Sequence, residues 1–234
     1  MVHPREKSIL AGAMMSSVPN ILGRGVYTFA DAARLTGLSR TRVREWFVGS
    51  GTDRGRLFSP DYPPEGTAHA ISFLDLIDVF VAGQLREHGV SLPTVRKVYA
   101  KLGTDLGFTH AFCRKELLTD GKSVFVRGLD KSGEDEIYEA LTRQKAFPEL
   151  ILPFLQRIEY ERMTAARWRI TDGVVLDPAV SFGQPVVAEA VIPTYILAAA
   201  YHANGKDAER VADWYNVTTD AVSIAVRFES ELAA

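Results

Sequence analysis

Arginines occupy every second position in one short segment, at Arg40, Arg42 and Arg44. An arginine guanidinium group is always charged, binds phosphate groups, and donates paired hydrogen bonds to the edge of guanine. The segment therefore has the chemistry needed to bind duplex DNA. The plainer alternative is an ordinary surface helix, because arginine is also a good helix former. The residues expected to contact DNA are Ser39, Arg40, Thr41, Arg42, Arg44, Arg54 and Arg56.

No pattern in the chain indicates catalysis or metal binding. The five histidines, at positions 3, 69, 88, 110 and 202, lack the spacing of metal ligands, and no CxxC motif exists. The glycines at 49, 51 and 55 lack the lysine of a phosphate-binding loop. Asp75 and Asp78 would share one helix face, where carboxylates are usually solvated. We therefore predict no catalytic residue, no metal and no cofactor, and an enzyme is the least favoured class.

The single cysteine, Cys113, excludes an internal disulfide and indicates a reducing compartment. We expect a free, half-buried thiol rather than a nucleophile, because His110 is the only histidine near it in the sequence. No apolar stretch reaches membrane-spanning length. Met1–Asn20 is too weakly apolar for a secretion signal, so we interpret it as the flexible leader of a cytoplasmic protein.

Charge is distributed unevenly along the 234 residues, although the net charge is only -2. From Ser39 to Arg56, five arginines stand against two acidic residues, which gives +3. From Ile170 to Ala234, three basic residues stand against nine acidic ones, which gives -6. Only the first of these regions is suited to phosphate.

The residues around the arginines predict two helices joined by a tight turn. Thr28 can cap a first helix, and Gly37 is the residue expected in the left-handed turn that ends it. Ser39 can cap a second helix, whose apolar residues from Val43 to Phe47 repeat at helical spacing. The arginines then lie on flanks that stay solvated. This is the layout of a helix-turn-helix with a basic second helix.

Glycines and prolines interrupt the chain after the second helix. Between them, Arg56–Phe58 and Ala70–Ser72 could form the two short strands of a wing. That wing would place Arg54 and Arg56 at a loop tip beside the duplex.

Two further helices are predicted after the wing. Ser72 with Asp75 forms a capping signal for a helix that stops near Gly89. The next helix starts at Ser91-Leu92-Pro93, because proline is tolerated in a first turn.

Residues 27–102 resemble a winged helix-turn-helix of the MerR type. The matching features are Tyr27-Thr28, Gly37-Leu38-Ser39, the arginine-rich helix ending in Trp46-Phe47, the basic wing, and His88-Gly89-Val90-Ser91-Leu92-Pro93. The resemblance implies DNA binding through the second helix and the wing. The wing is longer than usual, and no coiled-coil helix or sensor cysteines follow it, so metal or drug sensing of that family's kind is not expected.

The middle of the chain has weaker patterns. Leu117–Val126 predicts a hairpin closed by Asp120-Gly121. Ile137–Gln144 and Pro153–Met163 are predicted to be helical. The second of these helices would be amphipathic, and serves equally well as an oligomer contact or as a linker packed on its own domain.

The tail resembles an antitoxin-associated domain from a family long labelled as of unknown function. The matching segments are Ile170–Pro178, Phe182-Gly183-Gln184-Pro185-Val186-Val187 and Ile192-Pro193-Thr194. In that family a buried strand leads into a three-helix bundle, here Thr194–His202, Asp207–Tyr215 and Thr218–Leu232. Chains that join this tail to a winged helix resemble VapB-type antitoxins, which pair with a PIN-domain ribonuclease toxin. The resemblance implies such a toxin as partner.

The acidic tail favours a protein partner over DNA, because carboxylates facing phosphates would repel them. Its aromatic residues Trp214, Tyr215 and Phe228 are candidate partner-binding residues. The alternative is that all three belong to the core.

These patterns together predict a mainly α fold with four regions. They are a leader (1–24), a winged helix-turn-helix (25–107), a central hairpin and helix (108–167), and a helical tail with a short β segment (168–234). The predicted function is an antitoxin that neutralises a PIN-domain toxin and represses its own promoter as a homodimer. The alternative is a stand-alone MerR-like regulator whose tail senses a small molecule or a protein. We also expect the two functions to be separable near residue 165.

Overall fold

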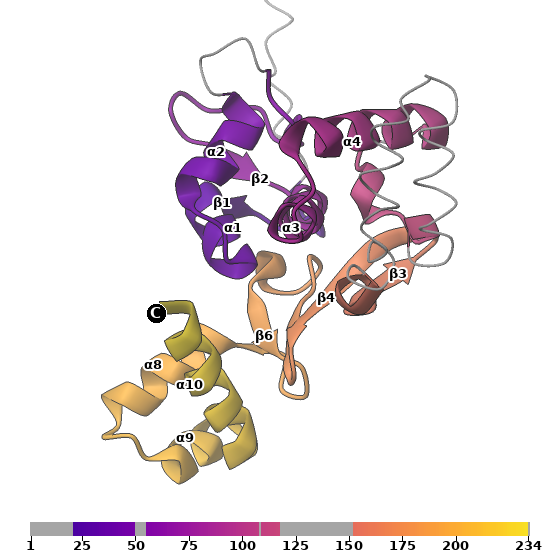
Figure 1. Cartoon of the computed structure of the whole chain (residues 1–234). Helices are drawn as coiled ribbons and strands as arrows, with labels where there is room; N and C mark the ends of the chain where they lie inside the picture. The colour runs from indigo at the N-terminus through magenta and orange to yellow at the C-terminus, as the bar shows by residue number, and fades with distance from the viewer. Residues whose placement is uncertain (1–20, 50–54, 108, 118–151, 234) are drawn as a thin grey trace, which may run out of the picture.

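The structure is a computed structural model and describes residues 21–49, 55–107, 109–117 and 152–233. Figure 1 shows the N-terminal elements at the top, a sheet below them, and the C-terminal helices at the bottom. The N-terminal part contains β1 (Tyr27–Thr28), α1 (Phe29–Thr36), α2 (Arg40–Val48), β2 (Ala70–Ile71), α3 (Phe73–Glu87), α4 (Leu92–Leu106) and the short 3-10 helix η1 (Ala111–Cys113).

The helix starts predicted from the sequence are confirmed by the capping contacts. Thr28 Oγ1 accepts from the Asp31 amide at 3.1 Å, and Asp31 accepts from the Thr28 amide in return. Ser72 and Asp75 form the same reciprocal box at the start of α3. Gly37 ends α1 in the left-handed region, with φ 71°.

The predicted wing pairing is wrong. β2 pairs antiparallel with β1, with Tyr27 opposite Ile71, and not with Arg56–Phe58. The amides of Leu57 and Phe58 both donate to the carbonyl of Trp46, at 2.7 and 2.9 Å. Leu57 and Phe58 are therefore fixed to the end of α2, and their backbone donors are not available for a strand.

The second part of the chain is richer in strands than the sequence predicts. Five strands form an antiparallel sheet in chain order. They are β3 (Ile158–Glu161), β4 (Thr164–Thr171), β5 (Val174–Leu176), β6 (Pro185–Val187) and β7 (Ile192–Pro193), with the 3-10 turn η2 (Ser181–Gly183) before β6. A mainly α class is therefore only partly correct.

The helix predicted over Pro153–Met163 is wrong at β3. Ile158 pairs with Trp168, and Glu161 pairs with Thr164 across a tight turn. Apolar and acidic residues alternate along this strand, which is a period of two. The turn gives no sequence signal, because its two residues at positive φ are arginine and methionine rather than asparagine and glycine. The predicted hairpin beyond Leu117 and the helix over 137–144 lie outside the described residues.

The three predicted C-terminal helices are confirmed as α8 (Thr194–Ala203), α9 (Ala208–Tyr215) and α10 (Thr219–Ala233). Asn216 ends α9 in the left-handed region, with φ 52°. The helices enclose a small core of their own, formed by Val187, Leu197, Val211, Ala212, Ala221, Val222 and Ala225. No helix within the described part of the chain has both the length and the apolar character needed to cross a membrane.

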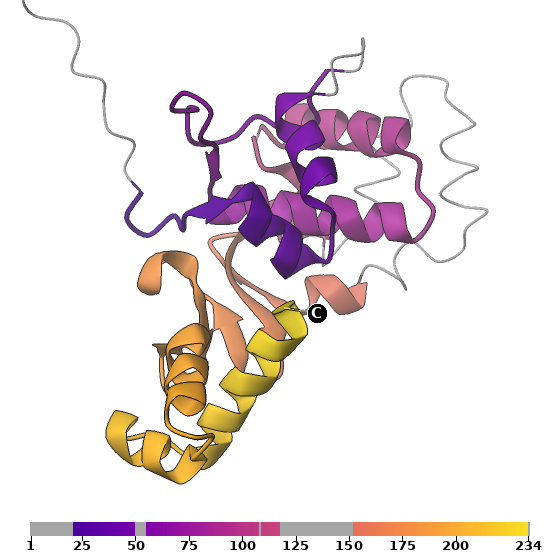
Figure 2. The same ribbon diagram turned by 90° about the vertical axis from the view of Figure 1, so that its left-hand side faces the viewer.

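The N-terminal helices and the sheet share one hydrophobic core. Trp168 of β4 packs on Phe80 of α3, with ring centroids 4.4 Å apart. Val174 and Leu176 of β5 and Phe228 of α10 belong to the same buried cluster. Figure 2 shows the sheet between the N-terminal helices and the C-terminal bundle. The core thus extends across the region boundary expected at residues 167 and 168.

Gly183 forms a close contact between the sheet and β1. Its φ is +82°, and an added Cβ would lie 2.2 Å from Tyr27 Oη. Its carbonyl accepts from the Tyr27 hydroxyl at 2.7 Å. We therefore expect Gly183→Ala to lower the free energy of unfolding by about 1–3 kcal/mol, through backbone strain and overpacking.

Chemical denaturation followed by circular dichroism measures this change. The control is Tyr27→Phe, which removes the hydrogen bond without adding volume and should cost about 0.5–1.5 kcal/mol. If Gly183→Ala were as stable as the wild type, the close contact between Gly183 and Tyr27 would be contradicted.

Candidate nucleic-acid interface and buried polar cluster

Helix α2 presents its arginines to solvent. Ser39 caps α2 by accepting from the Arg42 amide at 3.3 Å. Val43, Trp46 and Phe47 form the buried side of the helix. The other six residues of the helix are exposed, and they are Arg40, Thr41, Arg42, Arg44, Glu45 and Val48. No described residue forms an ion pair with these three arginines, so their guanidinium groups are available to a polyanion.

Aromatic packing fixes the orientation of α2. Phe47 stacks on Phe29 of α1 at 5.5 Å, and Trp46 meets the edge of Phe58 at 6.0 Å. In the turn between the helices, Leu38 lies over Gly83 of α3, where an added Cβ would come within 3.1 Å of it. The exposed side of α2 is therefore held on a rigid support, as a reader of base edges requires.

Arg56 is exposed beyond the C-terminal end of α2. Its carbonyl accepts from the guanidinium group of Arg96 on α4, at 3.3 Å. Arg96 is a basic neighbour that the sequence pattern did not reveal, because it lies 40 residues away on another helix. Arg54 lies outside the described residues.

The three candidate partner-binding aromatics in the tail are placed differently from one another. Trp214 is 62% exposed on α9, and the Arg210 guanidinium lies 5.8 Å from its ring centroid. Tyr215 is also exposed. Phe228 is buried in the shared core, so it is not part of a surface. The proposed surface therefore reduces to Trp214 and Tyr215.

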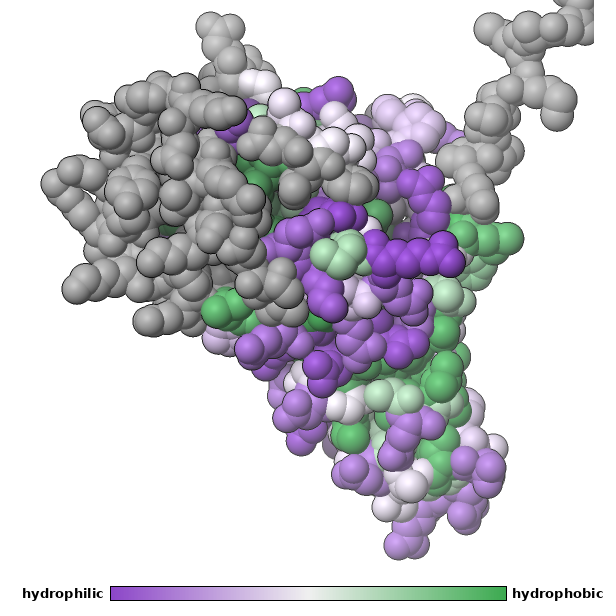
Figure 3. Space-filling view, turned by 90° about the vertical axis from the view of Figure 1, so that its right-hand side faces the viewer, coloured by the Kyte–Doolittle hydropathy of each residue, from purple (hydrophilic) through white to green (hydrophobic). Residues whose placement is uncertain are grey.

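The surface differs between the parts of the molecule. One face is hydrophilic over its middle, with hydrophobic groups along the margin that leads to the C-terminal bundle (Figure 3). Figures 1 and 2 place the bundle at the opposite end of the molecule from α4. A cleft of about 510 Å³ lies between the start of α3 and the sheet, and its charged lining includes Arg24, Asp61, Glu159, Arg167 and Asp177.

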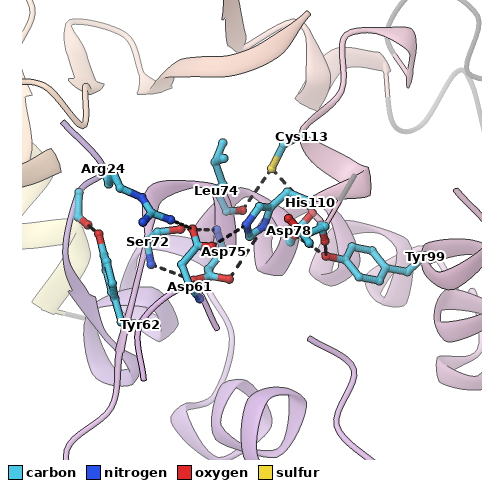
Figure 4. Close-up of polar contacts among 12 residues, drawn as sticks. Arg24, Asp61, Tyr62, Ser72, Leu74, Asp75, Asp78, Tyr99, His110 and Cys113 are labelled. Carbon is cyan, nitrogen blue, oxygen red and sulfur yellow. Dashed lines mark hydrogen bonds and ion pairs between the residues drawn. The ribbon is translucent and has the colours of Figure 1, made fainter. Parts of the chain in front are cut away.

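A buried polar cluster lies around α3, where the sequence predicted solvated carboxylates. Asp75 and Asp78 of α3 are each only 1% exposed. Between the acidic groups lies the ring of His110, with Nδ1 2.9 Å from Asp78 Oδ2 and Nε2 3.2 Å from Asp61 Oδ1 (Figure 4). Cys113, expected to be half-buried, is fully buried and donates to the carbonyl of Leu74 at 3.2 Å.

The electrostatics of the cluster follow from burial and hydrogen bonding. Burial opposes the charged imidazolium, but its contacts with Asp61 and Asp78 outweigh this and raise the pKa of His110 to about 10. Burial raises the pKa of Asp75 to about 6, although two backbone N–H groups donate to it. Burial also raises the pKa of Asp78 and of the Cys113 thiol. For Asp61 burial acts upward, but the contact with His110 holds its pKa well below the usual range.

One sequence signal could have located this cluster. Residues 73–85 are apolar on every side of the helix apart from two acidic residues and Gln84. A helix that is hydrophobic all round is buried in a core. Its carboxylates must then be buried too, and buried charges require partners.

Comparisons with known proteins give similarity over most of the chain. No protein-family model matches it. It is 27% identical over 222 residues to a Mycobacterium tuberculosis (strain ATCC 25618 / H37Rv) protein named "Putative antitoxin VapB45", covering 86% of this chain and 92% of that protein. The fold is similar to the X-ray crystal structure of Rv2018 from Mycobacterium tuberculosis, with a TM-score of 0.70 and 26% identity over 86% of this chain and 96% of that one. Both matches therefore include N-terminal and C-terminal elements.

Proposed function

We propose that the protein is the antitoxin of a type II toxin–antitoxin pair, which neutralises a PIN-domain ribonuclease toxin and represses its own promoter. The observation that carries the proposal is the likeness, over 86% of the chain, to the Mycobacterium tuberculosis protein with antitoxin in its name. Exposed arginines on a supported helix favour DNA as the second partner.

In this proposal the two partners bind different regions. DNA is bound by residues 25–107, through α2 and the loop that carries Arg54 and Arg56. The toxin is bound by residues 168–234, where nine acidic residues disfavour phosphate and Trp214 is exposed. The central residues 108–167 connect them.

The protein binds DNA as a homodimer in this proposal, because one winged helix offers few phosphate contacts. Half-sites should lie about one helical turn, or a multiple of it, apart. Light scattering on the free protein and on its promoter complex measures the oligomeric state. A strict monomer in both would contradict dimeric binding.

Co-expression with the product of the adjacent gene tests the antitoxin function. We expect the two proteins to co-purify, and we expect the chain to relieve growth arrest caused by the partner alone. The complex should also shift a fragment of its own promoter in a mobility assay. A partner that neither binds nor arrests growth would refute the proposal.

We expect Trp214→Ala to weaken binding of the toxin by roughly 2 kcal/mol or more, about 30-fold, because exposed tryptophans are typical interface hot spots. Calorimetric titration of the toxin measures the affinity. The matched control is Phe182→Ala, which removes an aromatic side chain of similar exposure outside the helical bundle. Equal effects of the two substitutions would move the interface away from α9.

The charged cleft beside α3 favours a second candidate, a stand-alone MerR-like regulator that senses a small molecule. Six charged side chains line the cleft between the start of α3 and the sheet, where a ligand would contact both. The absence of a nuclease gene beside this one, together with a ligand-dependent change in DNA affinity, would favour this function over the antitoxin.

A further inference from the structure

The buried cluster contains the donor types of a metal site. One ligand atom from each of Asp78, His110 and Cys113 lies within 4.8 Å of the others, and all three residues are buried. Asp75 Oδ1 is buried beside them, has no hydrogen-bond partner in the described structure, and lies 3.9 Å from His110 Nδ1. A buried carboxylate oxygen that accepts no hydrogen bond requires an explanation, and a bound cation is one of the few explanations.

We propose that Asp75, Asp78, His110 and Cys113 bind one divalent transition-metal ion, with Zn²⁺ as the best match. Two carboxylate oxygens, one imidazole nitrogen and one sulfur make a four-ligand set of the types that Zn²⁺ accepts. Metal bonds of 2.0–2.3 Å in a tetrahedron place ligand atoms about 3.4 Å apart. His110 Nδ1 lies 2.9 Å from Asp78 Oδ2 and 3.9 Å from Asp75 Oδ1. Cys113 Sγ lies 3.7 Å from the other oxygen of Asp78, Oδ1, and the ligand atoms of Asp78, His110 and Cys113 all lie within 4.8 Å of one another.

Outer hydrogen bonds hold these ligands as they do in protein metal sites. His110 uses Nε2 to contact Asp61, which leaves Nδ1 directed at the ligand set. Asp61 is fixed in turn by Arg24, at 2.6 Å. Asp78 accepts from the Tyr99 hydroxyl at 2.8 Å and from the Phe112 amide at 3.1 Å. Figure 4 shows these groups converging from α3, α4, η1 and the loop before β2.

Charge balance permits the ion to enter a buried site. The incoming ion adds two positive charges, while His110 Nδ1 and Cys113 Sγ each release one proton to solvent. The formal charge of the cluster is therefore unchanged. The cleft between α3 and the sheet lies next to the cluster, because two residues of its lining, Asp61 and Leu74, contact His110 and Cys113.

Cobalt substitution of the full chain tests the site directly. Cys113 is the only cysteine, so an ultraviolet charge-transfer band from thiolate to Co²⁺ reports ligation by that residue alone. We expect one Co²⁺ per chain with this band, which Zn²⁺ then displaces. Zn²⁺ at 100 times its dissociation constant should raise the melting temperature by roughly 5–10 °C.

Variants assign the ligands. Cys113→Ala should abolish the band, and Asp75→Asn should weaken Co²⁺ binding at least tenfold, whereas the control His202→Ala on exposed α8 should bind as the wild type does. If a variant fails to fold, the charge-transfer band of the wild-type protein alone decides whether the site binds the ion. The site is refuted if wild-type protein gives no stoichiometric band, or if the band survives in Cys113→Ala. Neither result depends on DNA or toxin, so this test is independent of the antitoxin function.

Discussion

Replacing Trp168 by alanine is expected to lower the free energy of unfolding by about 3–5 kcal/mol, the range for large aromatic residues in a core. Trp168 is only 2% exposed and packs against Phe80 of α3. Removal of the indole opens a cavity where the sheet meets the N-terminal helices. Chemical denaturation followed by far-ultraviolet circular dichroism measures the loss, because this signal does not depend on the tryptophan itself.

Trp214→Ala is the matched control, since it removes the same side chain from an exposed position. Its unfolding free energy should stay within about 0.5 kcal/mol of the wild type. If Trp168→Ala unfolded at the same denaturant concentration as this control, the sheet and the N-terminal helices would not share a core in solution.

The same contact changes the expectation for a shortened chain. The charge division near residue 165 predicts that a fragment ending at Met163 keeps DNA binding. Such a fragment lacks Trp168, Val174, Leu176 and Phe228, which all belong to the core around α3. We now expect the fragment to lose stability, and to lose DNA affinity for that reason rather than through missing contacts to DNA.

Helix ends could be predicted from the sequence because their signals are local. A cap such as Thr28, Ser39 or Ser72 bonds to an amide three residues ahead, within the same segment. The left-handed turn at Gly37 also depends on its own backbone. The two helices and the exposure of the arginines on the second of them follow from these short-range rules.

Strand partners could not be predicted in the same way. β2 pairs with β1 across more than 40 residues of chain, and the nearer Arg56–Phe58 segment is held by α2 instead. Over Pro153–Met163 an amphipathic pattern suggested a helix, whereas pairing with β4 makes Ile158–Glu161 a strand. A strand is stabilised by hydrogen bonds and side-chain contacts with its partner strand. The residue pattern within one segment does not show which partner that will be.

The buried cluster shows the same limit for a functional site. Its members come from three separate segments of the chain. Asp78 lies 32 residues before His110 in the sequence, and Asp61 lies 49 residues before it. Ligand spacing in a sequence detects sites built on one helix or one hairpin. It does not detect a site that assembles only when α3 is covered on every side.

Arg40→Ala and Arg44→Ala should each weaken binding to the specific promoter site by roughly 1–3 kcal/mol and reduce discrimination against mismatched sites. The two residues lie one turn apart in the N-terminal half of α2, and both are exposed. Arg56→Ala should instead weaken all DNA sequences alike and lower the salt dependence by about one unit of slope. Fluorescence anisotropy with specific and scrambled duplexes, over a salt series, measures both effects.

Arg210→Ala is the control, because it removes an exposed arginine from the acidic tail without touching α2. It should leave DNA affinity unchanged, while its toxin affinity reports on the neighbouring Trp214. If Arg56→Ala changed sequence preference and Arg40→Ala did not, the loop rather than α2 would read the bases. If Arg210→Ala lowered DNA affinity as much as the α2 substitutions, affinity would follow total positive charge. Helix α2 would then make no specific contact with the duplex.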